Sequence, residues 1–333
     1  MLDLPRLERI KLTPRSLAQR VVGRVILMPN YELFNRVPIV VTGKENIPDE
    51  PVIFAMNHTD RYNYFPFLHH FWTLRRRYMA TWVKGKYYEH GFVGQFMEKT
   101  NQLPTVSRGY IITKEFEAAV GRVPTTDEYD ALRRWVDGTS LGPNAEALPD
   151  FDALPKALLE EPRNVLGHPF DPGKNDFAAH VNEVFGLFMR RFVELNEETS
   201  GKGLDILIFP QGTRSIRLLP AHVGISQMAL HLKHPIVPVG CNGCDKIYPG
   251  SSPWAKKGKV VYRFGEPIPY EELAEFHIEE SFAPFTAEAE HKHRREFEGV
   301  AALVTDRIDG LLDPEYQRSG GSSTAVSGTD RFV

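Results

Sequence analysis

Hydrophobic positions along the chain fall into short runs separated by glycine, proline, asparagine or charged residues. Each run has roughly four to eight residues and is rich in β-branched side chains, the pattern of strands that are buried on both faces of a sheet. The pattern predicts strands at 39–43, 51–56, 78–83, 103–107, 205–210, 236–241 and 259–265.

Helical periodicity lies between these runs, most clearly at 176–199, 221–232 and 293–312. Strands that alternate with helices indicate an α/β fold, here a mostly parallel or mixed sheet flanked by helices. Ligands of such sheets bind beyond the carboxyl ends of the strands. We therefore expect functional side chains directly after strands.

Composition divides the chain further. Residues 1–34 read as an N-terminal helical segment, in which Leu17, Val21 and Val22 alternate with arginines as in an interfacial amphipathic helix or a plain packing helix. The main domain is predicted at 35–317, with an acidic helical insertion at about 109–175. The Gly/Ser/Thr-rich end, 318–333, predicts a disordered tail.

Charge excludes one class of function and suggests another. A net charge of −3 with a pI near 6.5 argues against a nucleic-acid partner bound by bulk charge. Residues 1–108, however, carry 16 Lys and Arg against 9 Asp and Glu. This basic third could face anionic lipid or an anionic substrate, and a solvated basic surface accounts for it equally well.

Neither a secretory signal nor a transmembrane helix is predicted, because the start has no apolar core and no run reaches ~18 apolar residues. The two cysteines, Cys241 and Cys244, form one C-x-x-C without neighbouring ligands. We expect buried or loop thiols of a reduced intracellular protein and no metal site.

One histidine stands where a catalytic base would be useful. His58 follows the predicted strand 51–56 and can take a proton from a hydroxyl if an acceptor orients its second ring nitrogen. Arg108 follows 103–107, and "FPQGTRS" at 209–215 places Arg214 after 205–210. These arginines are suited to holding a phosphate, with a surface ion pair as the alternative.

Taken in order, these stretches resemble the glycerolipid (PlsC-like) acyltransferase family. Asn57 and His58 match its N-H-x4-D motif, and Arg108 matches its strand that ends in arginine. "FPQGTRS" matches F-P-E-G-T-R-S at six of seven positions, and 237–239 matches its V-P-V strand. The resemblance covers about 35–110 and 176–315.

The resemblance implies acyl transfer to the hydroxyl of a lysophospholipid such as lysophosphatidate. His58 would be the general base, and Arg108 and Arg214 would hold the acceptor's phosphate. The other substrate-binding residues would be Asn57, Gln211, Gly212 and Thr213. No cofactor is implied, and acyl-CoA or acyl carrier protein would be the co-substrate. The implied location is cytoplasmic, with peripheral association to the inner face of a membrane.

Two departures from the family pattern bear on catalysis. Asn63 and Gln211 stand where the family has aspartate and glutamate. In a serine-protease triad, the Asp-to-Asn change costs about 10⁴ in rate because it favours the wrong tautomer. An amide oxygen can nevertheless orient an imidazole. Asp60 could be a substitute partner in an irregular turn, or else a helix cap or a partner for Arg61.

The alternatives to this enzyme are an acyl-binding protein of the same fold without turnover, favoured by the two amides, and an acyltransferase with a non-phosphorylated acceptor. Intact His58, Gly212 and Arg214 favour the active acyltransferase, and the lost charge at Gln211 is consistent with the non-phosphorylated acceptor.

Overall fold

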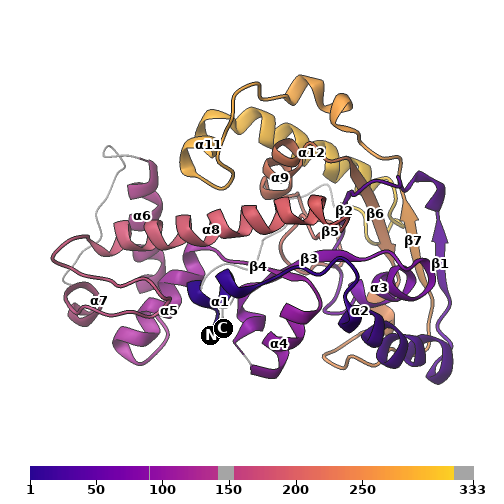
Figure 1. Cartoon of the computed structure of the whole chain (residues 1–333), viewed down its shortest axis with the longest axis horizontal. Helices are drawn as coiled ribbons and strands as arrows, with labels where there is room; N and C mark the ends of the chain where they lie inside the picture. Colours follow the sequence, from indigo (N-terminus) through magenta and orange to yellow (C-terminus); the bar gives the residue numbers. More distant parts are fainter. Residues whose placement is uncertain (90, 142–153, 319–333) are drawn as a thin grey trace.

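The fold is described here from a computed structural model, in which residues 1–89, 91–141 and 154–318 are described. The predicted tail lies outside these ranges except for Arg318, and so does the segment 142–153 of the predicted insertion. Figure 1 shows a central sheet with helices on both sides and a helical arm at one end.

All of the predicted strands are confirmed, and they form one sheet in the order β1-β7-β6-β2-β5-β3-β4. β6, β2, β5, β3 and β4 are parallel, whereas β7 runs antiparallel to β6, so the sheet is mixed as expected. The strands are β1 Ile39–Thr42, β2 Ile53–Met56, β3 Met79–Lys84, β4 Gln102–Thr105, β5 Asp205–Ile208, β6 Ile236–Asn242 and β7 Val260–Phe264.

The three helices that the sequence predicts are present: α8 and α9 lie between strands, and α12 follows the last strand. The α-helices are α1 Leu4–Arg9, α2 Leu17–Val22, α3 Tyr64–His69, α4 Gly91–Lys99, α5 Arg108–Val120, α6 Thr126–Leu141, α7 Lys156–Glu160, α8 Phe177–Gly201, α9 Gly224–Leu232, α10 Cys244–Ile247, α11 Ala287–Lys292 and α12 Arg294–Asp309. The π-helices are η1 Gly23–Leu27, η2 Pro29–Phe34 and η4 His70–Arg75, and the 3₁₀ helices are η3 Lys44–Asn46, η5 Gly85–Tyr88 and η7 Tyr270–Phe276.

Side chains of the central strands alternate between the two faces of the sheet, and helices cover both faces, so both sets of side chains are buried. On β2, Ile53 and Ala55 join one core with α9 and α12. Phe54 points to the opposite core, where its ring packs against Phe67 of α3 and Phe71 of η4. Figure 1 shows α9 and α12 on one side of the sheet and α3 on the other. This double burial explains why the strands read as continuous apolar runs.

The predicted insertion contains α5 and α6, which pack with each other and with α8, and α7, which packs against α5; they lie in the arm at the end of the molecule away from β1 (Figure 1). A buried ion pair lies within this arm, where Arg163 Nε donates to Glu115 Oε2 at 2.7 Å. The other end of α8 packs against β4 and β5. One long helix therefore joins the arm to the sheet.

The N-terminal segment continues from α2 through η1 and η2 and leaves several large apolar side chains exposed. Leu17, Val25 and Phe34 are each about two-thirds exposed, at 68%, 67% and 67%. Within the described ranges, none of the helices has the length and apolar character that crossing a membrane requires.

Candidate active site

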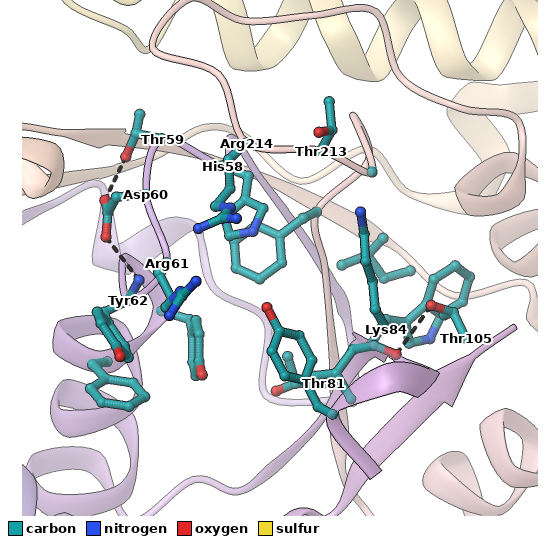
Figure 2. A pocket seen from close by; sticks show the side chains of 18 of the residues that line it. His58, Thr59, Asp60, Arg61, Tyr62, Thr81, Lys84, Thr105, Thr213 and Arg214 are labelled. Carbon is teal, nitrogen blue, oxygen red and sulfur yellow. Dashed lines mark hydrogen bonds between the residues drawn. The ribbon is translucent and has the colours of Figure 1, made fainter. Parts of the chain in front are cut away.

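A cavity of about 1050 Å³ opens at the carboxyl ends of the parallel strands, the edge at which the sequence predicts a ligand. Its lining includes His58 after β2, Lys84 at the end of β3, Thr105 at the end of β4 and Phe209 after β5. Figure 2 shows the cavity from close by. Residues that lie more than one hundred positions apart in the sequence therefore meet here because parallel strands end at one edge.

His58 is oriented by the amide of Asn63. The ring nitrogen Nδ1 lies 2.9 Å from Asn63 Oδ1. Asn63 itself is fully buried, directly before α3. The N-H-x4-x spacing therefore produces the contact that the resemblance implies, with an amide in place of a carboxylate.

The orientation of this amide follows from its other contact. Asn63 Nδ2 lies 2.7 Å from the carbonyl oxygen of Asn57, and a carbonyl can only accept a hydrogen bond. The NH₂ group must therefore face Asn57, so Oδ1 faces the imidazole and His58 Nδ1 carries the proton. Nε2 is left with its lone pair, and no described residue forms a hydrogen bond to it. Asn63 thus stabilises the tautomer that a general base needs.

The ring and backbone of His58 are also held by the loop after β5. Its imidazole stacks on Phe209, with ring centroids 4.3 Å apart and planes 27° apart. Its carbonyl accepts a hydrogen bond from the backbone N–H of Ser215 at 2.8 Å. The two loops therefore hold His58 together, although more than one hundred residues separate them in the sequence.

Gln211 lies behind this contact and does not line the cavity. Its Nε2 donates to the carbonyl oxygens of Thr213, at 2.9 Å, and His58, at 3.3 Å, while its Oε1 accepts from the backbone N–H of His58 at 3.3 Å. A glutamate could not donate to either carbonyl. The amide suits this position, where its hydrogen bonds hold the two loops together; that Gln211 binds the substrate stays a prediction.

Burial lowers the pKa of His58 from 6.5 to about 4, because the surroundings disfavour the charged imidazolium. The hydrogen bond to Asn63 acts in the opposite direction, and the positive charges of Arg214 and Lys84 lower the pKa further. At neutral pH the ring is therefore uncharged and ready to accept a proton.

Asp60 does not take the place of Asn63. Its Oδ2 accepts from the hydroxyl of Thr59 at 2.8 Å, and its Oδ1 accepts from the backbone N–H of Tyr62 at 2.8 Å (Figure 2). Both oxygens are occupied within the loop, and burial raises the pKa of the carboxyl. Asp60 lines the cavity, but the partner of the His58 ring is Asn63.

The side chain of Asn57 forms two hydrogen bonds with the backbone of the neighbouring strand β6. Its Nδ2 donates to the carbonyl of Cys241 at 3.0 Å, and its Oδ1 accepts from the backbone N–H of the same residue at 2.7 Å. This pair fixes the end of β2 to β6 immediately before His58. Its side chain holds the scaffold and does not line the cavity, although the resemblance implies a substrate contact.

Gly212, Thr213 and Arg214 line the cavity as expected. Gly212 has a φ of +64°, and a Cβ there would approach His222 Cδ2 to 2.8 Å, so the turn requires glycine. Arg214 is exposed, and no described residue pairs with its guanidinium.

Arg108 does not line the cavity and contacts α8 instead. Its Nε donates to Asn182 Oδ1 of α8 at 2.7 Å, and its guanidinium lies 4.2 Å from the ring centroid of Phe185. The prediction that Arg108 binds the substrate is therefore not supported by its position. It joins the start of α5 to α8, because the strand end that carries it turns directly into that helix.

Sequence reasoning missed Lys84, Arg61 and His222, all of which line the cavity. Lys84 ends β3, so the rule that placed the other candidates would have found it. Arg61 stands in a variable position of the histidine motif, and His222 follows a loop whose path only the fold decides. Both cysteines are buried free thiols, and the described part of the chain holds no cluster of three or more metal-ligating side chains.

Comparisons with known proteins found similarity among solved structures. No protein-family model matches the chain, and no curated protein matches it either. Among solved structures, the chain is similar to the 1-acyl-sn-glycerophosphate (LPA) acyltransferase PlsC from Thermotoga maritima. The identity is 16%, the match covers 91% of this chain and 85% of that chain, and the TM-score is 0.42. A superposition of this quality supports no conclusion about activity, which depends on the geometry of the site.

Proposed function

We propose that this protein is an acyltransferase that moves an acyl group from acyl-CoA or acyl carrier protein to the hydroxyl of a lysophospholipid such as lysophosphatidate. One observation carries the proposal. His58 is neutral, its Nδ1 proton is committed to Asn63, and its Nε2 is free at a large cavity.

In the proposed reaction, Nε2 of His58 takes the proton of the acceptor hydroxyl while its oxygen attacks the thioester carbonyl. A tetrahedral intermediate collapses as the carbon–sulfur bond breaks. The leaving thiolate then takes the proton back from the imidazolium. Thioesters are activated donors, so a base oriented by an amide is sufficient for a modest barrier.

The walls of the cavity suit the two ends of such an acceptor. Aromatic and aliphatic side chains provide apolar surface for an acyl chain, and they include Tyr64, Phe65, Val93, Phe96 and Met97. Arg214 supplies a guanidinium whose geometry matches a phosphate. The volume is sufficient for a lipid-sized ligand.

A lipid substrate would be collected at a membrane surface. We define the N-terminal apolar-basic surface as a set of exposed side chains on α2, η1 and η2 and just before them: Leu17, Val21, Val25, Ile26, Leu33 and Phe34 with Arg15, Arg20 and Arg24. Apolar side chains next to arginines suit the headgroup level of an anionic leaflet. This surface supports the proposal that the protein associates peripherally with the cytoplasmic face of a membrane.

The test incubates the purified full chain with oleoyl-CoA or oleoyl-acyl carrier protein and lysophosphatidate in mixed micelles, with mass spectrometry of the product. His58→Ala should lower the rate by at least about 10²-fold, the usual range for a lost general base. His231→Ala is the matched control, because this histidine lies on α9, bonds Glu197 and does not line the cavity. Binding of acyl-CoA without product from any donor or acceptor would indicate the acyl-binding protein instead.

A further inference from the structure

Among the cationic side chains that line the cavity, two arginines are available to a ligand. Arg61 and Arg214 are both exposed, and neither forms a hydrogen bond or an ion pair with any described residue. Figure 2 shows Arg61 on one side of His58 and Lys84 on the other. A guanidinium without a partner beside a catalytic base is a ready site for an anionic group.

The loop itself explains why Arg61 has no internal partner. The nearest carboxylate in the sequence is Asp60, whose two oxygens bind the Thr59 hydroxyl and the Tyr62 N–H. The bond from Asp60 to the N–H two residues on forms an Asx-turn, with Arg61 at its middle position. Asp60 is 8% exposed whereas Arg61 is exposed, so the turn buries the acid and presents the base.

We infer that Arg61, together with Arg214, holds the phosphate of the acceptor and so determines that the acceptor is phosphorylated. This inference rests on the proposed function and names a residue that sequence reasoning did not assign. Phosphate is the group that fits, because a planar guanidinium fork binds its oxygens in pairs. Arg108, which the sequence suggested for this role, is occupied by Asn182 and Phe185.

Phosphate could also come from the donor, since coenzyme A carries several. The position of Arg61 favours the acceptor. It lies three residues after His58 on the same loop, and His58 must contact the acceptor hydroxyl. In lysophosphatidate, that hydroxyl and the phosphate are attached to the same three-carbon glycerol unit. An arginine next to the base is therefore within reach of the acceptor's phosphate.

Asp60 follows as a positioning residue. Asparagine at this position keeps an oxygen that accepts from the Tyr62 N–H, whereas alanine removes the turn that presents Arg61. We expect Asp60→Ala to raise the KM for lysophosphatidate and Asp60→Asn to retain the wild-type KM. If Asp60 had only a structural role, Asp60→Ala would alter kcat and thermal stability but would not raise the KM for lysophosphatidate specifically.

The central experiment compares Arg61→Gln with wild type on two acceptors, lysophosphatidate and monoacylglycerol, under saturating oleoyl-CoA. We expect KM for lysophosphatidate to rise about ten- to hundredfold, because one or two charge-assisted hydrogen bonds to the phosphate are lost. The change in kcat should be smaller. KM for monoacylglycerol and for oleoyl-CoA should be unchanged. Arg217→Gln is the control, since this exposed arginine donates to the carbonyl of Gln317 and does not line the cavity.

Calorimetric binding of short-chain lysophosphatidate without any donor separates this inference from the proposed function. If wild type binds the lipid more tightly than Arg61→Gln but forms no product with any donor, the acyl transfer is refuted and the phosphate site stands. Equal binding by the two proteins, or equal KM values for lysophosphatidate, overturns the role of Arg61. A raised KM for oleoyl-CoA alone overturns it too, by assigning Arg61 to the donor's phosphates. Unchanged thermal melting of Arg61→Gln establishes that the variant is folded.

Discussion

At the scale of single residues, the site depends on which atoms of an amide donate and which accept. Asn63 orients His58 correctly only because its NH₂ group is already committed to the carbonyl of Asn57. The large loss that follows an Asp-to-Asn change in a protease triad arises from the wrong tautomer, and this arrangement avoids that tautomer. An amide at position 63 is therefore compatible with a working base.

Asn63→Asp tests this argument. A carboxylate next to Nδ1 favours the imidazolium, so the pKa of His58 should rise from about 4 toward its ordinary value of 6.5. The rate should gain roughly tenfold or less, since the tautomer is already correct. The lost donor to Asn57 should cost about 1–3 kcal/mol of unfolding free energy. NMR titration, kinetics and urea unfolding measure these changes, and an unchanged pKa would contradict the assigned contact.

The lowered pKa of His58 also predicts the pH dependence of activity. The base is neutral at any pH well above 4, so the acid limb of kcat/KM should lie near pH 4 to 5 and not near 6.5. Because the folded pKa lies below the unfolded value, the unfolded chain binds protons first as pH falls. The contribution of the neutral His58 to the free energy of unfolding is thus fully present above about pH 6.5 and is lost as pH falls toward 4. A kcat/KM profile with its limb at 6.5 in wild type would show that the ring is more hydrated than this site implies.

At the scale of elements, the amino ends of three strands, opposite the cavity, are held by one buried ion pair. Arg77, just before β3, donates from Nε and Nη2 to the two carboxylate oxygens of Asp205 at 2.5 and 2.6 Å. Asp205 begins β5, and its Oδ1 also accepts from the N–H of Val52, just before β2. Three neighbouring strands therefore start in register, and their other ends, which carry the site, are positioned relative to one another.

Arg77→Met should destabilise the fold strongly, because it leaves the carboxylate of Asp205 buried without its partner. The expected loss is about 3–5 kcal/mol of unfolding free energy, the range for a broken buried pair. Arg122→Met is the control, since its partner Glu128 forms an exposed pair worth about 0–1 kcal/mol. Urea unfolding measures both, and equal losses would mean that Asp205 is better hydrated than its burial indicates.

At the scale of the whole molecule, the cavity and the N-terminal apolar-basic surface must cooperate if the substrate is a lipid. Replacing Leu17 and Val21 together with serine should weaken binding to anionic vesicles several-fold, as apolar area and arginines contribute jointly. Val123→Ser is the control, because this exposed valine lies in the turn between α5 and α6, in the arm away from β1 (Figure 1). Vesicle sedimentation measures the partition, and an unchanged value would remove this surface from the proposal.

The sequence by itself determined the strands and the residues that follow their ends. Runs such as "PVIFAM" and "DILIFP" are apolar on both faces because β2 and β5 are covered on both sides, so their pattern revealed strands and strand ends. It also placed His58, Gly212, Thr213 and Arg214 correctly at the cavity, because a residue that follows a parallel strand lies at one shared edge.

Only the tertiary structure decided how the side chains at that edge are used. Arg108 and Arg214 both follow strands, but the first is taken by α8 and the second remains free, a difference that depends on a helix far away in the sequence. Likewise, Asp60 and Asn63 both lie near His58, and contacts of each with backbone groups select Asn63 as the partner of the ring. Local pattern fixes where a residue emerges from the sheet, whereas hydrogen-bond satisfaction between distant segments fixes what its side chain can still bind.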